Sequence, residues 1–242
     1  MGKQGKKKRI WLRVLLGILA ALLLVIIGYV LYVMISYHRL PDDLTLDVRT
    51  PENADITGTV SVGTDYEIIT YNIGFGAYTP DYSFFMDGGK SSVAASKESV
   101  LATVSGAGEL AAGYDPDFMI FEEVDLKATR SYHVDEYELL DKYFSGYYSD
   151  FAINYDSAFL MVPPWEPHGK SLAGIAFYSK YPIASAVRKS FPISTSFSKF
   201  LDLDRCYSIS RIPADNGKEL VIFSLHMSAY GNSDAIREAQ VN

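Results

Sequence analysis

The 242-residue sequence contains one cysteine, Cys206. An intramolecular disulfide is therefore excluded, and with it the small folds that depend on several disulfides for their stability. A single thiol in the segment 204–207 is expected to be a small buried side chain rather than a nucleophile. Internal repeats and low-complexity segments are also absent, so the composition favours one sizeable folded core with an additional element.

One stretch lacks charge altogether. Residues 14–35 are 22 consecutive residues without a charged side chain, and a helix of that length crosses a hydrocarbon core of about 30 Å. A cleaved signal peptide is the alternative, but its apolar core is shorter and ends in small residues, whereas this run ends in bulky ones. We therefore expect an uncleaved signal anchor. Its amino-terminal side carries six cations, namely Lys3, Lys6, Lys7, Lys8, Arg9 and Arg13.

These cations predict the orientation of the chain in the cell membrane. By the positive-inside rule they remain in the cytoplasm, so the protein is expected to be single-pass, with its amino terminus inside and its catalytic domain extracellular. The expected divisions are a basic cytoplasmic tail (1–13), the transmembrane anchor (14–36), a stalk or linker of little periodicity (37–64) and a folded domain (65–242).

Basic residues are scarce outside the tail. Subtracting the six tail cations from the 22 basic residues leaves 16 against 29 acidic residues, a net charge of −13. Proteins that bind long nucleic acids gain affinity by neutralising phosphates, and are expected to be basic. The charge therefore favours a small or lipid-embedded phosphate ester over a nucleic acid, although a local basic groove would reverse that inference. The oligomeric state is not indicated.

A short apolar run leads directly into carboxylates. Residues 118–121 are four consecutive apolar residues, typical of a strand that is buried on both faces, and Glu122 and Glu123 follow them. Open α/β sheets place ligand sites at such strand ends. Two adjacent carboxylates require a cation, a proton or full solvation, and Mg²⁺ is the natural cation for oxygen ligands. A solvated pair at the strand end is the alternative.

Two further apolar strands end in polar residues. Residues 67–71 lead into Asn72, and residues 220–225 lead into His226. If the three strands are neighbours in one sheet, their ends would bring together an amide, a metal ligand and an imidazole. His226 has the alternative of being a core histidine satisfied by hydrogen bonds. The aromatic loop 74–90 either overhangs this site or is a surface excursion stabilised by its own packing.

The remaining pattern predicts helices and strands in alternation. Helices are expected at residues 91–112, at 130–144 and from residue 234 onward, and a long loop at 152–170. A strand is expected at 173–178, and residues 205–212 and 220–225 are expected to form a hairpin. His133 and His168 have no carboxylate at a useful spacing, and both are expected to be surface or loop residues.

Five segments together resemble the endonuclease/exonuclease/phosphatase superfamily, to which pancreatic deoxyribonuclease, neutral sphingomyelinases and inositol-polyphosphate 5-phosphatases belong. The resemblance implies an α/β (α+β) fold, a two-layer β-sandwich flanked by helices and here preceded by one transmembrane helix. The segments occur in the family's order over about 170 residues. They are TYNIGFG (70–76), DFMIFEEVD (117–125), GIAFYSKYPI (174–183), LVIFSLHMS (220–228), and Arg237 with Gln240.

The resemblance also implies roles for individual residues. Glu123 would be the ligand of a divalent metal, Mg²⁺ with Mn²⁺ or Ca²⁺ as alternatives. Asn72 would help to hold the metal shell and the phosphate, and His226 would contact the scissile phosphate. Glu122 and Ser224 replace the glutamine and the asparagine that are usual in the family, so Glu122 is expected to make a structural interaction. Arg130 would clamp a phosphate oxygen, or would be a solvated arginine that starts a helix.

The implied function is that of a metal-dependent phosphoric ester hydrolase that acts on a phosphodiester or phosphomonoester, in a lipid headgroup or a nucleic acid. The family's later Gly-Asp-x-Asn and Ser-Asp-His motifs do not occur in the sequence. We therefore expect a C-terminally truncated member whose sandwich is incomplete at that end, an inactive fragment of a phosphodiesterase. The alternatives are a catalytically dead, membrane-tethered binding module of the same fold and a structural surface protein.

Overall fold

The computed structural model describes residues 3–52, 54, 57–193, 203–228 and 238–241, and it divides the chain into two compact units. The first unit is Met1–Tyr37 and the second is His38–Asn242. The boundary falls at the end of the predicted anchor. Arg237 and the first part of the helix predicted from residue 234 lie outside the described residues, whereas residues 238–240 are helical.

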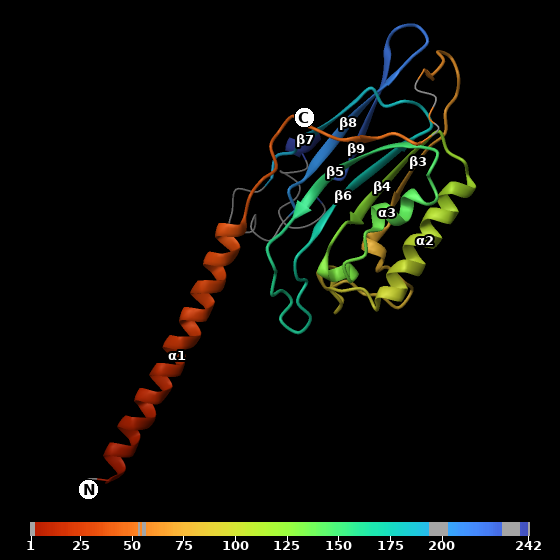
Figure 1. Cartoon of the computed structure of the whole chain (residues 1–242). Coiled ribbons are helices and arrows are strands. Elements are labelled where there is room, and N and C mark those ends of the chain that lie inside the picture. Colours follow the sequence, from red (N-terminus) through yellow and green to blue (C-terminus); the bar gives the residue numbers. More distant parts are fainter. Residues whose placement is uncertain (1–2, 53, 55–56, 194–202, 229–237, 242) are drawn as a thin grey trace. The chain divides into compact units, whose positions relative to one another are not determined.

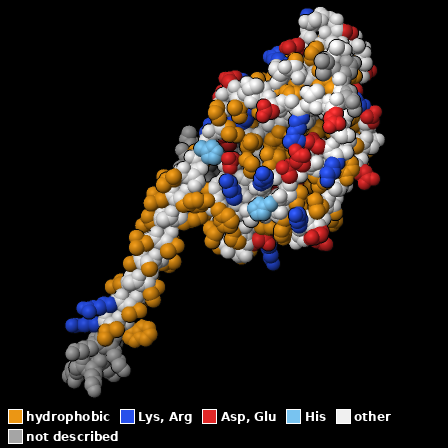
Figure 2. All heavy atoms as spheres, viewed as in Figure 1, with side chains coloured by type: hydrophobic (Ala, Val, Ile, Leu, Met, Phe, Trp, Pro, Cys, Tyr) orange, Lys and Arg blue, Asp and Glu red, His pale blue; other side chains and the backbone are white. Residues whose placement is uncertain are grey.

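The first unit consists of one helix, α1 (Lys3–Ser36). Within it, the 28 residues Arg9–Ser36 are long and apolar enough to cross a membrane, by length and composition alone. Hydrophobic side chains are exposed along most of this segment, and Lys or Arg side chains appear near its amino-terminal end (Figure 2). The predicted apolar helix is confirmed, whereas the orientation of the chain and the fate of the helix stay predictions.

The second unit contains two β-sheets (Figure 1). The five-stranded sheet has the order β2 (Val48–Arg49), β5 (Tyr148–Asp156), β6 (Leu172–Ser179), β4 (Phe118–Asp125) and β3 (Ile68–Asn72). The four-stranded sheet has the order β1 (Leu44–Thr45), β7 (Ser185–Ser190), β8 (Cys206–Pro213) and β9 (Glu219–Leu225). All neighbouring strands are antiparallel except β3 and β4, which are parallel and are connected through helix α2 (Lys97–Gly113).

Alternating side chains of β4 and β6 form two cores. Phe118 and Phe177 belong to a cluster shared with β7, β8 and β9, which fills the space between the two sheets. Met119 and Tyr178 point to the opposite face, where they pack against α2 and the short helix α3 (Glu136–Asp141). The predicted two-layer sandwich flanked by helices is therefore confirmed.

The helices predicted at residues 91–112 and 130–144 begin or end at other residues than the sequence pattern indicates. Helix α2 begins at Lys97 rather than at residue 91, because the Ser96 hydroxyl accepts a hydrogen bond from the Ser99 backbone N–H and caps the first turn. The helix predicted at residues 130–144 is interrupted. Its first part is a 3₁₀ turn, η3 (Thr129–Ser131). Tyr132 and His133, which follow the turn, both have positive φ angles, and α3 begins only at Glu136.

Four strands, β1, β2, β5 and β7, were not predicted from the sequence. Within the predicted stalk, β1 and β2 pair with β7 and β5, so this segment extends both sheets; each strand has two residues, too few to show a period. Strand β5 continues to Asp156 and shortens the predicted loop 152–170. Strand β7 buries a charged residue, Arg188, whose guanidinium donates to Ile153 O, Ser190 Oγ and Asp204.

A carboxyl group lies between the sheets at Asp150 of β5. It is fully buried, and its Oδ2 atom accepts a hydrogen bond of 2.7 Å from the Ser210 hydroxyl of β8. Burial raises the pKa of Asp150 from 3.8 to about 7, and the hydrogen bond opposes the shift. The folded protein therefore binds a proton that the unfolded chain has lost, and the stability contributed by this group falls as the pH rises from about 4 to about 7.

We expect the substitution Asp150→Asn to remove this pH dependence. Between pH 5 and pH 8 the free energy of unfolding of the variant should rise by about 2 to 3 kcal/mol relative to that of the unsubstituted protein, because one pKa unit corresponds to about 1.4 kcal/mol. Urea unfolding of both proteins at several pH values measures the difference. A constant difference at all pH values would show that Asp150 is ionised in the folded state even at pH 5.

Candidate functional site

A β-bulge positions the two glutamates at the end of β4. The register between β4 and β6 shifts between Phe121 and Val124, and Glu123 has a positive φ of 57°. A bulge re-aims the side chains within it, so the two carboxylates diverge. Glu122 accepts a hydrogen bond from the Thr70 hydroxyl on β3, as its predicted structural role requires. Glu123 instead lines a cavity.

Asn72 holds the carboxylate of Glu123 in place. The Asn72 amide donates from Nδ2 to Glu123 Oε1 at 3.0 Å, and its Oδ1 atom accepts from the Gly74 backbone N–H at 2.9 Å. Both ends of the amide are thus engaged, which fixes its orientation. The parallel pairing of β3 with β4, in which Asn72 lies opposite Glu122, brings the two strand ends together. The predicted proximity of Asn72 and Glu123 is confirmed.

His226 reaches the same carboxylate from the other sheet. It follows β9, and its Nε2 atom lies 3.7 Å from Glu123 Oε1. The three strands are therefore not neighbours in one sheet, and their ends converge because the two sheets face each other. Burial and the positive charge of Arg205 lower the pKa of His226 to about 4, against the opposing effect of Glu123. The imidazole is neutral at pH 7.

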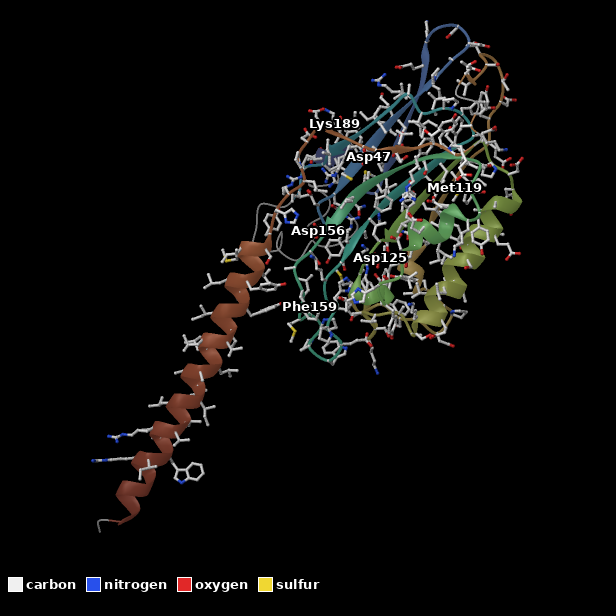
Figure 3. The ribbon with its side chains drawn as sticks, viewed as in Figure 1. Asp47, Met119, Asp125, Asp156, Phe159 and Lys189 are labelled. Atoms are coloured by element: carbon white, nitrogen blue, oxygen red, sulfur yellow. The ribbon has the colours of Figure 1, made fainter. Side chains whose placement is uncertain are left out.

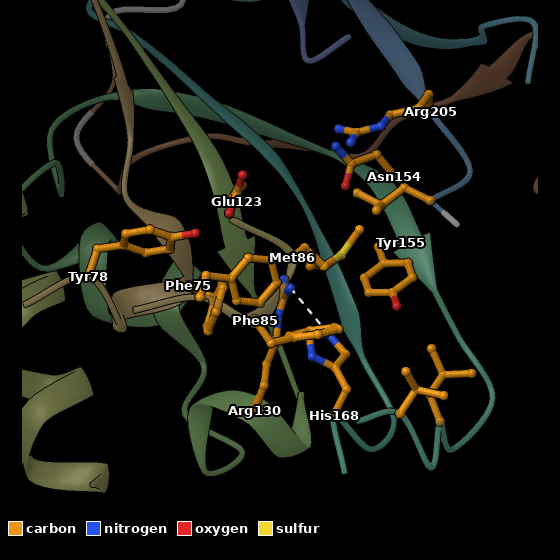
Figure 4. A pocket seen from close by; sticks show the side chains of 15 residues that line it. Phe75, Tyr78, Phe85, Met86, Glu123, Arg130, Asn154, Tyr155, His168 and Arg205 are labelled. Atoms are coloured by element: carbon orange, nitrogen blue, oxygen red, sulfur yellow. Dashed lines mark hydrogen bonds between the residues drawn. The ribbon is translucent and has the colours of Figure 1, made fainter. Parts of the chain in front are cut away.

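A cavity of about 240 Å³ opens beside Glu123 (Figure 4). The aromatic loop 74–90 forms part of its wall, and the rings of Phe75, Tyr82 and Phe84 also pack edge to face or stack on one another. The loop therefore both lines the site and is stabilised by the packing of its own aromatic rings. The cavity is lined by Phe75, Tyr78, Phe84, Phe85, Met86, Glu123, Arg130, Asn154, Tyr155, Leu160, Val162, His168, Ala173, Leu203 and Arg205.

Arg130 lies in the wall of this cavity as half of a buried ion pair. Its Nε atom donates to Asp125 Oδ2 at 3.0 Å and its Nη2 atom to Asp125 Oδ1 at 2.8 Å, and its guanidinium lies 4.1 Å from the centre of the Phe75 ring. Burial opposes the charge of Arg130, but Asp125 prevails and raises its pKa. A solvated arginine at the start of a helix is therefore the wrong interpretation. Figure 3 shows Asp125 and Met119 toward opposite ends of β4.

Two other histidines were expected on the surface or in loops. His133 is exposed. His168 lies in a loop but is buried in the cavity wall, where its Nε2 atom is 3.5 Å from Arg130 Nη1. Burial and the charge of Arg130 lower the pKa of His168 to about 3, so it is neutral. The predicted loop position of His168 is confirmed, but the residue is buried and contacts Arg130, which is 38 residues away in the sequence.

The donor set around Glu123 is compatible with one type of metal site. Among the described residues there is no group of three or more His, Cys, Asp or Glu side chains that could hold a metal ion. Glu122 is turned toward Thr70, and Asp125 is bound to Arg130. A single carboxylate matches Mg²⁺ held by one or two carboxylates, with water and substrate phosphate as the other ligands. It does not match a metal enclosed by protein ligands alone.

No family model matches the sequence, and no curated protein matches it. Solved structures are similar to it. An endonuclease/exonuclease/phosphatase from Beutenbergia cavernae DSM 12333 is 17% identical with a TM-score of 0.52, over 73% of this chain and 42% of that chain. A family protein from Leptotrichia buccalis C-1013-b is 16% identical with a TM-score of 0.39, over 68% and 54%. ANGEL2, a 2',3'-cyclic phosphatase in complex with adenosine-2',3'-vanadate, is 13% identical with a TM-score of 0.47, over 81% and 48%.

The chain thus spans about half the length of the solved structures that it matches. The first of these likenesses, with a TM-score of 0.52, is a likeness of fold. This chain has the fold of the endonuclease/exonuclease/phosphatase superfamily.

Proposed function

We propose that the protein is a membrane-anchored, extracytoplasmic phosphoesterase that hydrolyses a phosphodiester or a phosphomonoester by in-line attack of water. The observation that carries this proposal is the convergence of two side chains, those of Asn72 and His226, on one carboxylate oxygen of Glu123. Asn72 Nδ2 lies 3.0 Å and His226 Nε2 lies 3.7 Å from Glu123 Oε1, beside a cavity whose wall contains two buried arginines.

Each of these residues has a distinct role in the proposal. Glu123 holds Mg²⁺, for which Mn²⁺ or Ca²⁺ would substitute, and the bound ion would neutralise charge on the phosphoryl oxygens. Asn72 fixes the position of the Glu123 carboxylate. His226 is a neutral imidazole and carries one N–H group, which donates to a phosphoryl oxygen as negative charge develops there.

Arg130 acts differently from a free phosphate clamp. Its Nε and Nη2 atoms are bound to Asp125, and only its Nη1 edge faces His168 and the cavity. We propose that it contributes positive potential to the cavity wall and keeps the wall rigid. The Phe75 ring, which packs against the guanidinium, links it to the aromatic loop.

The substrate class follows from charge and from the lining of the cavity. The sequence outside the tail has a net charge of −13, which disfavours long nucleic acids. Met86, Leu160, Val162 and Leu203 give the cavity an apolar side. A phosphate ester with an apolar part, such as that of a lipid, fits this combination better than a polynucleotide, and the candidate membrane span would hold the enzyme near such a substrate.

The test is hydrolysis in detergent by the full-length protein, because the 242 residues lack the Gly-Asp-x-Asn and Ser-Asp-His motifs and are expected to be inactive by themselves. We expect the release of nitrophenol from bis-p-nitrophenyl phosphate or p-nitrophenyl phosphate to fall to background after chelation of divalent cations, and to return on addition of Mg²⁺. Mn²⁺ and Ca²⁺, added separately, rank the metals. A protein that binds inorganic phosphate without hydrolysing either ester would contradict the enzyme and favour the alternative, a catalytically dead binding module of the same fold.

A further inference from the structure

Two β-bulges lie at the same level on either side of strand β6. On one side, the pairing of β4 with β6 shifts so that Val124 lies opposite Gly174. On the other side, the pairing of β5 with β6 shifts between Ile153 and Tyr155, with Ile153 also opposite Gly174. The first bulge contains Glu123 and the second contains Asn154. Since a bulge re-aims the side chain within it, one structural device directs both residues into one cavity.

Gly174 permits this arrangement. A Cβ atom at residue 174 would lie 2.3 Å from the Ala152 carbonyl oxygen and 2.6 Å from the Phe151 ring. The backbones of β5 and β6 therefore approach more closely here than any other residue type would allow. The close approach of the two backbones beside the bulge at Asn154 thus depends on a glycine at residue 174.

The side chain of Asn154 is polar, buried and without an acceptor for its amide hydrogens. The residue is 1% exposed, and Nδ2 has no hydrogen-bond partner among the described residues. Buried amides are normally paired, so a donor left open in a cavity wall indicates a site for an acceptor. The neighbouring side chain in the cavity is Arg205, which is 4% exposed and can only donate (Figure 4).

We propose that Asn154 and Arg205 bind the non-bridging oxygens of the phosphate ester on which Glu123 and His226 act. This assignment rests on the proposed function and adds two substrate-binding residues to it. Amide and guanidinium N–H groups require an acceptor that offers at least two oxygens, and a phosphoryl group provides them. An apolar group in this position would leave the amide hydrogens of Asn154 unpaired. Asn154 and Arg205 line the same cavity as Glu123 (Figure 4), which places both donors on the side of the candidate reacting groups.

The test is the affinity of the full chain in detergent for inorganic phosphate, measured by calorimetry. We expect Asn154→Ala to weaken binding about 10-fold, because one hydrogen bond to a charged group is lost. Asn154→Asp should weaken it about 100-fold or more, because a carboxylate would face the phosphate. Asn216→Asp introduces the same charge in the exposed turn between β8 and β9, and should leave the affinity unchanged.

Unchanged phosphate affinity in folded Asn154→Ala protein would overturn the proposal, as would equal effects of the alanine and aspartate variants. If neither variant folds, the phosphate affinity of Arg205→Gln is measured instead. An affinity equal to that of the unsubstituted protein then refutes the proposed binding site. Hydrolysis by the same proteins separates the two proposals. Phosphate binding that depends on Asn154 in a protein without hydrolysis supports the binding site and contradicts the enzyme. Hydrolysis with the same KM in both Asn154 variants supports the enzyme and contradicts the binding site.

Discussion

Replacing Glu123 by glutamine is expected to lower the rate of phosphate-ester hydrolysis about 100-fold or more at saturating Mg²⁺. Glutamine keeps the shape of the side chain and can still accept the hydrogen bond from Asn72, which lies 3.0 Å from Oε1. It removes the negative charge, and among the described residues that line the cavity Glu123 is the one carboxylate. The measurements are the steady-state rate and, separately, the binding of Mn²⁺ by electron paramagnetic resonance, which should also weaken.

The neighbouring residue supplies the matched control. Glu122→Gln makes the same chemical change one position earlier, where the carboxylate accepts from the Thr70 hydroxyl. Glu122 does not line the cavity, and glutamine can accept the same hydrogen bond from Thr70, so this replacement removes no charge from the cavity wall. We expect its hydrolysis rate to stay within about 3-fold of the unsubstituted rate. Similar losses in both variants would mean that the bulge, rather than the charge of Glu123, is what matters.

Replacing Arg130 by methionine is expected to lower the free energy of unfolding by about 3 to 5 kcal/mol, because it leaves a buried carboxylate without its partner. Asp125 is fully buried, and its backbone N–H is already committed to Glu136 Oε2 at 2.8 Å. Glu136 is buried too, and burial and then the charge of Asp125 raise its pKa. Among the described residues, Arg130 is the side chain that donates hydrogen bonds to the Asp125 carboxylate. Urea unfolding at pH 7 measures the loss of stability.

An exposed ion pair gives the comparison. Arg211 Nη1 lies 2.8 Å from Glu219 Oε2, and the two side chains are 45% and 43% exposed. We expect Arg211→Met to cost less than about 1 kcal/mol, since water solvates the remaining carboxylate. Adding Asp125→Asn to Arg130→Met should recover part of the lost stability. A cost for Arg130→Met as small as that for Arg211→Met would show that Asp125 becomes protonated or hydrated without difficulty.

Strand β4 was predictable from the sequence because its residues 118–121 are apolar and buried on both faces. The β8–β9 hairpin was predictable for another reason, its turn Asn216-Gly217 between two strands. Strand β7 was not predictable, since its buried residue Arg188 is charged and satisfies its donors through residues distant in the sequence. The interruption of the helix predicted at residues 130–144 depends on positive φ angles at Tyr132 and His133. Neither residue type predicts a positive φ angle.

The residues of the candidate site were likewise predictable only in part. Glu123, Asn72 and His226 were predicted because each follows an apolar strand, and this pattern can be recognised in the sequence alone. Asn154 and Arg205 were not predicted as site residues. Asn154 lies in the segment predicted as a loop (152–170), and only the register of β5 against β6 shows that it occupies a bulge in a strand. The feature that identifies Asn154 is a bulge next to a glycine that has no room for a Cβ atom. This feature can be recognised only once the pairing of the strands is known.

The burial of Cys206 has a consequence for labelling chemistry. The thiol is fully buried, its Sγ atom lies 3.5 Å from Ile153 O, and burial raises its pKa to about 11. Maleimides and similar reagents attack the accessible thiolate, so the folded protein presents them with no reactive group of its own. Any cysteine introduced on the surface, for example in the turn at Asn216, would carry the label alone. Reagents that cannot cross a membrane would then report directly on which side of it the domain lies.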